Sequence, residues 1–398
     1  MSRSAEAPLL LDTASVLLPD RNETLFLKAC LGVETGRSWQ DWRAGQPVLR
    51  NAIAGLPACK RLLPLLFFTL THERIAIAQD ELALLRVAAT WEQRRAGRID
   101  ALLVGVLGAL RGVSIEPALL KGMALAHMAY PKPSLRHCHD IDLLVPERQH
   151  NAAADAVADL GFSKKETEDL DDRKLVLIHK DGLPVSIHAD LYPGNTHRTS
   201  VVEPRMIRTQ LAGVSALTLA PGELLLFMAS QLLAGRVRDR TSWVADAVFL
   251  LRVTKADDID WRGLTDQARD RGLALVLLAM LAYLNAEFET AIPGPALAYL
   301  REQARETAVA RDRLLFLLRQ NPDIRTGAMF QYSGWRSRLD IARWIAVPTK
   351  AYMQNWCREK GLRWPLAWYA LRPLRRLSIR IRALAGAARA TTGNEELR

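Results

Sequence analysis

The spacing of apolar residues divides the chain into a helical first part, a mixed middle and a second helical part. In residues 22–112 apolar positions recur at steps of three and four, as they do within 78–89, with polar residues between them. This spacing is typical of amphipathic helices that bury one face. Pro64 and Gly97 interrupt the pattern, and we expect the helices to break at both.

From residue 113 onward, short apolar runs alternate with turn residues, which is typical of strands interleaved with helices. We expect, in chain order, a strand at 117–120, a helix to 129, a turn at 131–134, a strand at 140–145, a helix at 148–160, and strands at 174–179 and 184–192. Gly161 is expected to end the second helix, and Asp181-Gly182 favours a tight hairpin turn between the last two strands.

The helical period returns after about residue 201. The expected helices there are at 223–235, 242–251, 261–272 and 273–288. The pattern therefore predicts an α+β fold, in which a mostly helical chain contains a small mixed sheet. We divide it into an N-terminal helical region (1–113), an α/β core (114–200), a helical domain (201–334) and a C-terminal segment (335–398).

The composition is that of a globular chain in a reducing compartment. Of the 398 residues, 49% are apolar and 24% charged, enough for one large core or two to three ordinary ones. The four cysteines form no C-x-x-C pair, which argues against a disulfide scaffold or a zinc knuckle. Because no signal-like segment and no apolar run of about 18 residues is present, we expect a cytoplasmic protein without a membrane span.

The net charge of +11 is concentrated at the C-terminal end. Residues 335–398 contain 14 Lys and Arg against 4 Asp and Glu, and five of the ten tryptophans, whereas the preceding residues are nearly neutral. Apolar residues within 374–388 follow a helical period with arginines largely on other faces, which predicts a basic amphipathic helix.

Three interpretations of this basic helix remain open. It can pack on the rest of the chain, bind peripherally to an anionic surface such as the inner membrane, or bind nucleic acid or an acidic peptide. The tryptophans favour the first two interpretations, because large aromatic side chains suit a core or a headgroup interface. Nucleic acid is the less favoured partner.

Two aspartates on one expected strand are the leading candidates for chemistry. Asp140 and Asp142 are two residues apart, so a strand places both side chains on one face, about 7 Å apart. Carboxylate oxygens suit Mg²⁺ or Mn²⁺ and a phosphate-bearing substrate. Upstream, Lys121-Gly122 lies where a strand ends and a helix begins, a place where backbone N–H groups can hold phosphates. The aspartate pair alone is weak evidence, since solvated acids at strand ends are common.

A later strand adds polar residues that share one face, namely Ser186, His188 and Asp190. For His188 we leave open a role in the site or a structural hydrogen bond. Asp246 lies within an apolar helix and needs a partner there, either an arginine such as Arg236 or Arg240 or the substrate.

Three residues just before Asp140 form a possible soft-metal cluster, but zinc is disfavoured. His137, Cys138 and His139 would alternate between the two faces of a strand, and no distant Cys or His pair completes a tetrahedral site.

The same segment resembles a bacterial family of uncharacterised nucleotidyltransferases in the DNA polymerase β-like superfamily. The similarity rests on ALLKGMALAHMAYPKPSLRHCHDIDLLV followed by VSIHADL, and is specific over residues 118–191. Looser similarity continues at 243–246, 259–261 and 368–373. The resemblance implies a polymerase β-like mixed sheet flanked by N- and C-terminal helical regions.

The resemblance also implies roles for individual residues. Asp140 and Asp142 would bind the metal, the Lys121-Gly122 turn would face the phosphates, and Arg136 would lie near the nucleotide, where Ser186 is also placed. The reaction implied is Mg²⁺-dependent transfer of a nucleoside phosphate from a nucleoside triphosphate, by default ATP. The acceptor stays open among a small molecule, a peptide and a glycan.

One position departs from the family pattern. Ser186 stands where the family usually has a carboxylate, and a serine does not act as a base or a full metal ligand at neutral pH. Our hypothesis is that Asp190, as metal ligand or base, or His188, as base, replaces the missing acid. Two alternatives keep the fold: a tailoring transferase that uses a nucleotide-activated sugar or similar donor on a peptide or secondary metabolite, and a degenerate nucleotide-binding protein without turnover.

Overall fold

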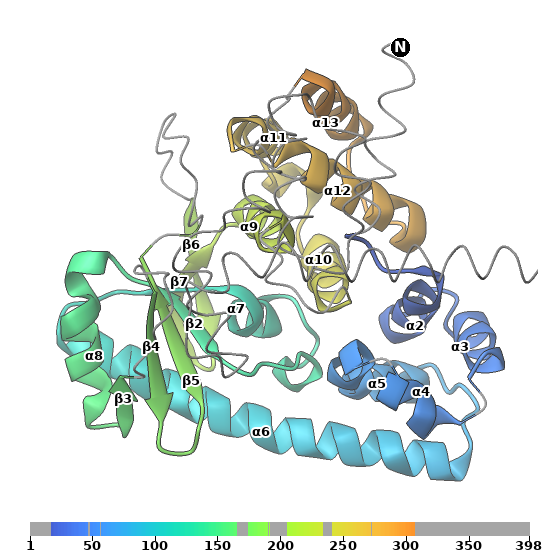
Figure 1. Ribbon diagram of the computed structural model, residues 1–398, viewed down its shortest axis with the longest axis horizontal. Helices are drawn as coiled ribbons and strands as arrows, with labels where there is room; N and C mark the ends of the chain where they lie inside the picture. Colours follow the sequence, from blue (N-terminus) through green and yellow to red (C-terminus); the bar gives the residue numbers. More distant parts are fainter. Residues whose placement is uncertain are drawn as a thin grey trace, which may run out of the picture. The chain divides into compact units, whose positions relative to one another are not determined.

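The middle of the chain folds into a seven-stranded mixed sheet, with helices before and after it along the chain (Figure 1). This computed structural model describes residues 17–306 except 47, 56, 165–173, 190, 192–204, 234–240 and 272. The described residues belong to one compact unit, 1–321, and the second unit, 322–398, lies outside them. The prediction of a basic amphipathic helix near the C-terminus therefore concerns residues outside the described part.

The sheet has the strand order β3-β4-β5-β2-β1-β7-β6. The strands are β1 (Ala118–Leu119), β2 (Ile141–Leu144), β3 (Phe162–Lys164), β4 (Lys174–His179), β5 (Pro184–His188), β6 (Met206–Leu211) and β7 (Val214–Leu219). Central β2 is parallel to β5 and antiparallel to β1, which in turn is parallel to β7. The α+β class predicted from the sequence is confirmed.

Helices precede and follow the strands along the chain, and shorter ones lie between strands. Before the sheet come α2 (Arg21–Leu31), α3 (Thr35–Ala44), α4 (Leu49–Gly55), the 3-10 turn η1 (Pro57–Leu62), α5 (Leu63–His72) and α6 (Gln79–Gly112). Between strands lie α7 (Lys121–Met128), η2 (Pro133–Leu135), η3 (Glu147–Gln149) and α8 (His150–Ala158). After the sheet follow α9 (Pro221–Leu233), α10 (Ser242–Val253), η4 (Ala256–Asp258), α11 (Trp261–Asp270), α12 (Ala274–Phe288) and α13 (Gly294–Glu306).

The structure differs from the sequence-based expectation at several elements. Helix α6 passes through Gly97 without a break, because the helix penalty of one glycine, about 1 kcal/mol, is small beside the burial of the apolar face of α6. Strands β3, β6 and β7 and helix α13 were not predicted. The β6–β7 hairpin turns at Ala212-Gly213, both with positive φ, and Ala-Gly is a much weaker turn signal than Asn-Gly or Asp-Gly.

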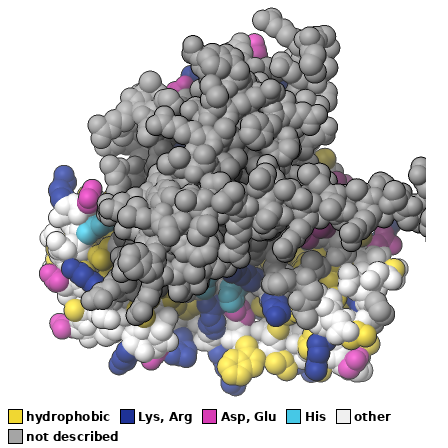
Figure 2. Space-filling model, viewed as in Figure 1, with side chains coloured by type: hydrophobic (Ala, Val, Ile, Leu, Met, Phe, Trp, Pro, Cys, Tyr) yellow, Lys and Arg dark blue, Asp and Glu magenta, His cyan; other side chains and the backbone are white. Residues whose placement is uncertain are grey.

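Helix α6 connects the N-terminal helices with the helices that cover the sheet. Its N-terminal half packs on α5 and its C-terminal half on α8, below the sheet in Figure 1. Ile99, Leu103 and Leu107 of α6 join α7 and α8 against one face of the sheet, where Ile141 and Leu143 of β2 are buried. Figure 2 shows Lys, Arg, His and hydrophobic side chains along the lower edge of the same view, where α6 runs.

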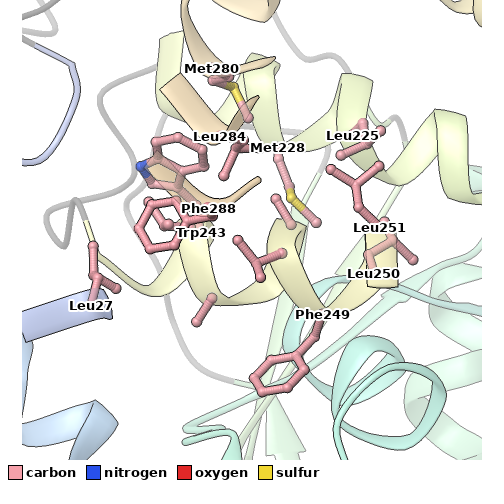
Figure 3. Packing of buried hydrophobic residues seen from close by; sticks show 14 of the residues in the cluster. Leu27, Leu225, Met228, Trp243, Phe249, Leu250, Leu251, Met280, Leu284 and Phe288 are labelled. Carbon is pink, nitrogen blue, oxygen red and sulfur yellow. The ribbon is translucent and has the colours of Figure 1, made fainter. Parts of the chain in front are cut away.

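A second, larger core forms among the helices that precede and follow the sheet. Figure 3 shows α10 at its centre, with Trp243 beside Phe288 and with Met228 of α9 nearby. Every residue of α10 from Trp243 to Leu251 is buried, including Asp246. None of the described helices is long and apolar enough to cross a membrane.

Candidate active site

Asp142 is the centre of a buried polar cluster at the middle of the sheet. Its side chain is only 3% exposed and accepts two hydrogen bonds at Oδ1, from Lys121 Nζ at 2.9 Å and from His188 Nε2 at 2.7 Å. Lys121 follows β1 and His188 ends β5. Because β2 and β5 are parallel, with Asp142 opposite Ser186, the side chains of Asp142, Ser186 and His188 share one face of the sheet. Three residues far apart in the sequence therefore meet.

The environment of Asp142 stabilises its ionised form. Burial alone would raise the pKa of this carboxyl, but the hydrogen bond from His188 and the positive charge of Lys121 outweigh burial and hold the pKa below the usual aspartate range. At neutral pH Asp142 is therefore an ionised carboxylate beside Lys121 and His188, and it can bind cations.

The turn between β1 and α7 brings Lys121 to this carboxylate. Lys121 has a φ of +52°, a left-handed conformation that costs a non-glycine residue about 1–3 kcal/mol. Leu120, the N-cap residue of α7, provides no side-chain hydrogen bond. The first N–H groups of α7, which carry the positive end of the helix dipole, therefore receive no side-chain cap from Leu120.

Arg136 lies against the start of α7 and is held by an acid from α10. Its Nε and Nη2 donate to the two carboxylate oxygens of Asp246 at 3.1 and 2.8 Å, and Tyr130 Oη donates to Oδ1 at 2.8 Å. Opposing desolvation, the charge of Asp246 raises the pKa of the Arg136 guanidinium well above its ordinary value. A Cβ on Gly122 would lie 2.6 Å from Cζ of Arg136, so only glycine allows this approach.

The partner of Asp246 is thus Arg136, which the sequence analysis placed near the nucleotide. Arg236 and Arg240, the two arginines considered from the sequence, lie outside the described residues. All three guanidinium nitrogens of Arg136 are engaged, since Nη1 donates to the carbonyl of His137. A direct contact between Arg136 and a nucleotide stays a prediction.

The remaining predicted site residues differ in their placement. Ser186 is 2% exposed and faces Asp142 across the β2–β5 pair. Asp140 immediately precedes β2, with a side chain 24% exposed and its Oδ2 3.6 Å from Nε2 of His139. Asp190 lies outside the described residues. Its predicted role with the metal or as a base stays a prediction.

The donors present suit a hard divalent cation in their chemistry. Asp140 and Asp142 supply carboxylate oxygens, and a cation already lies at Asp142 in the form of the Lys121 ammonium. Within the described part of the chain, no three His, Cys, Asp or Glu side chains cluster closely enough to hold a metal ion. Two carboxylates can hold a cation that also binds substrate phosphates.

The His-Cys-His run before Asp140 is engaged in other contacts. His137 Nδ1 lies 2.8 Å from Oε2 of buried Glu92 on α6, and Arg95 Nη1 lies 3.0 Å from the other oxygen of Glu92. Burial raises the pKa of the Cys138 thiol to about 11, against the opposing charge of Arg136. Glu92 was not predicted from the sequence, where its only signal is an acid at a core-facing position of an amphipathic helix.

The mixed sheet, the strand that contains Asp142 and the strand–turn–helix segment before it are the elements that the family resemblance predicted. The profile of a family described as uncharacterised nucleotidyltransferase matches residues 52–289. The chain belongs to this family, and the family supports a role in nucleotidyl transfer.

Among solved structures, an antigenic nucleotidyltransferase-like protein from Paracoccidioides brasiliensis is similar at 14% identity. The similarity covers 50% of this chain and 91% of that protein, with a TM-score of 0.32. We transfer no residue role from it. No curated protein matches the chain.

Proposed function

We propose that the protein is a metal-dependent nucleotidyltransferase that transfers a nucleoside phosphate from a nucleoside triphosphate to an acceptor. The supporting observation is the cluster in which Asp142 of β2 accepts hydrogen bonds from Lys121 and His188, beside the uncapped start of α7. Membership in the nucleotidyltransferase family supports the same reaction class.

The positive groups of the site suit a triphosphate. The Lys121 ammonium and the N–H groups at the start of α7 together form a site for phosphate oxygens. Mg²⁺ or Mn²⁺ held by Asp140 and Asp142 would neutralise the charge that develops on these oxygens during transfer. Lys121 then exchanges its hydrogen bond to Asp142 for one to phosphate, and His188 keeps the Asp142 carboxylate oriented.

The proposed transfer is an in-line displacement at the α-phosphorus. An acceptor oxygen forms a bond to this phosphorus, the bond to the bridging oxygen of the β-phosphate breaks, and pyrophosphate leaves with the electron pair. When the acceptor is a hydroxyl, its proton needs a base. Because Ser186 cannot take that proton, we propose Asp190 or His188 for this role.

The proposal is tested by calorimetry of the full chain with each nucleoside triphosphate, with and without Mg²⁺, and by assays of pyrophosphate release. We expect Mg²⁺-dependent binding and release, both reduced at least about 100-fold in Asp140→Asn and Asp142→Asn. Asp155→Asn is the matched control, because Asp155 is exposed on α8. Unchanged turnover in Asp190→Asn would remove Asp190 from the mechanism.

Two results contradict the proposal. Absence of metal-dependent binding for all the triphosphates refutes it. Binding without pyrophosphate release from any of them identifies instead a nucleotide-binding protein that has no turnover.

A further inference from the structure

One face of α6 carries an exposed tryptophan and three arginines. Trp91, Arg94, Arg95 and Arg98 follow the spacing i, i+3, i+4 and i+7, so they lie along a single helix face. Trp91 is 69% exposed, more than any other large hydrophobic residue in the described part of the chain. An exposed indole next to guanidinium groups combines a flat stacking surface with anion-binding groups.

This face forms one wall of a groove of about 380 Å³, here termed the α6 groove. The opposite wall consists of His139 and the β4–β5 turn at 181–183. The volume is within the range of small-molecule sites, about 300–1,000 Å³. Along the lower edge of the view in Figure 2, Lys, Arg, His and hydrophobic side chains lie among Asp and Glu side chains.

The groove keeps a net positive charge after its acids are counted. Glu92 is bound to His137 and Arg95, and Asp181 is bound to Arg98. Arg94 has no hydrogen bond or ion pair with any residue that the structure describes. The Arg98–Asp181 pair is exposed on both sides, 72% and 47%; such pairs contribute about 0–1 kcal/mol, so a phosphate group can displace the acid at little cost.

The α6 groove adjoins Asp140, one of the two carboxylates of the proposed site. His139 lines the groove, and its Nε2 lies 3.6 Å from Oδ2 of Asp140. Asp140 precedes β2 by one residue, at the same end of the sheet as the Lys121 turn. The groove therefore reaches the acidic site at Asp140.

We propose that the α6 groove binds the acceptor, and that this acceptor is nucleotide-like: a flat ring that stacks on Trp91 and a phosphate group held by Arg94 and Arg98. The role as acceptor rests on the proposed function, whereas binding of the ligand in the groove does not depend on catalysis. Both halves of the ligand are needed, because stacking and phosphate contacts each supply part of the affinity.

The probes are 5′-AMP, adenosine and inorganic phosphate, titrated calorimetrically into the full chain without divalent metal. We expect 5′-AMP to bind, and adenosine and phosphate each to bind at least about tenfold more weakly. Trp91→Ala and Arg94→Glu should each weaken 5′-AMP by about tenfold or more, whereas Trp91→Phe retains the stacking surface and most of the affinity. Arg86→Glu, an exposed change on another face of α6, is the matched control and should leave binding unchanged.

Saturation with a non-hydrolysable ATP analogue and Mg²⁺ separates acceptor from donor binding. We expect 5′-AMP still to bind under these conditions, and Asp142→Asn to keep 5′-AMP affinity while losing pyrophosphate release. Displacement of 5′-AMP by the analogue, no binding of 5′-AMP, or equal affinity in Trp91→Ala and Arg94→Glu overturns the assignment. Groove binding that depends on both residues, with no pyrophosphate release from any triphosphate, refutes the proposed function and leaves a nucleotide-binding groove.

Discussion

Replacing Asp246 tests whether the buried contact between Arg136 and α10 holds the site region together. The two side chains are 16% and 7% exposed and form a two-pronged ion pair, to which Tyr130 adds a hydrogen bond. In Asp246→Asn the guanidinium keeps its charge and its burial but loses the compensating carboxylate. Because Arg136 lies against the first turn of α7 at Gly122, we expect the change to destabilise the start of that helix.

The expected loss follows from the burial of the pair. Removing one partner of a buried ion pair costs about 3–5 kcal/mol, whereas replacing both partners by apolar residues of similar size is often neutral. Asp246→Asn should therefore lower the free energy of unfolding by about 3 kcal/mol or more. The double variant Arg136→Met with Asp246→Leu should be much more stable than the single variant.

Urea denaturation of the full chain at pH 7 measures these differences, and urea avoids screening the ion pair. With a slope near 3 kcal/mol per molar urea, the Asp246→Asn midpoint falls by about 1 M. Glu116→Gln is the matched control, because it breaks an exposed ion pair with Arg208 and should cause no measurable change. A midpoint shift in Asp246→Asn no larger than that of Glu116→Gln would refute the reasoning.

Three further predictions concern the same region. Gly122→Ala should lower the free energy of unfolding, measured in urea, by about 2 kcal/mol or more, because the new Cβ overlaps Arg136. Gly97→Ala is the control. A Cβ at Gly97 has nothing within 4 Å, so this change should raise the free energy of unfolding by up to about 1 kcal/mol. Cys138 should resist iodoacetamide at pH 8 in the folded protein, measured by peptide mass spectrometry, because its pKa is raised to about 11; rapid alkylation would contradict its burial. Folding lowers the pKa of Asp142, so the ionised carboxylate stabilises the folded protein fully above about pH 4 and progressively less below it. The difference in unfolding free energy between wild type and Asp142→Asn should therefore shrink at acid pH. A difference that grows at acid pH would contradict the direction of this pKa shift.

Local sequence was sufficient where neighbouring residues determine the structure. The period of apolar residues predicted most helices and the hairpin around Asp181-Gly182, because burial of one face and turn chemistry act over a few positions. The order of strand, Lys121-Gly122 turn, helix and D-x-D strand also placed Lys121 and Asp142 in one candidate site. The β6–β7 hairpin was missed because Ala212-Gly213 is a weak turn signal, and the place of β7 beside β1 depends on residues about 100 positions away.

Only the tertiary structure decided which charges meet. Asp246 was expected to need a partner, but nothing near it in the sequence identifies Arg136, and the glycine at 122 is explained only by the guanidinium that lies against it. Likewise, the sequence around Trp91 and the three arginines indicates only an amphipathic helix. The groove forms because the fold places the β4–β5 turn and His139 opposite these residues. Hydrophobic periodicity is a local property, whereas ion pairs and grooves form between elements that the fold brings together.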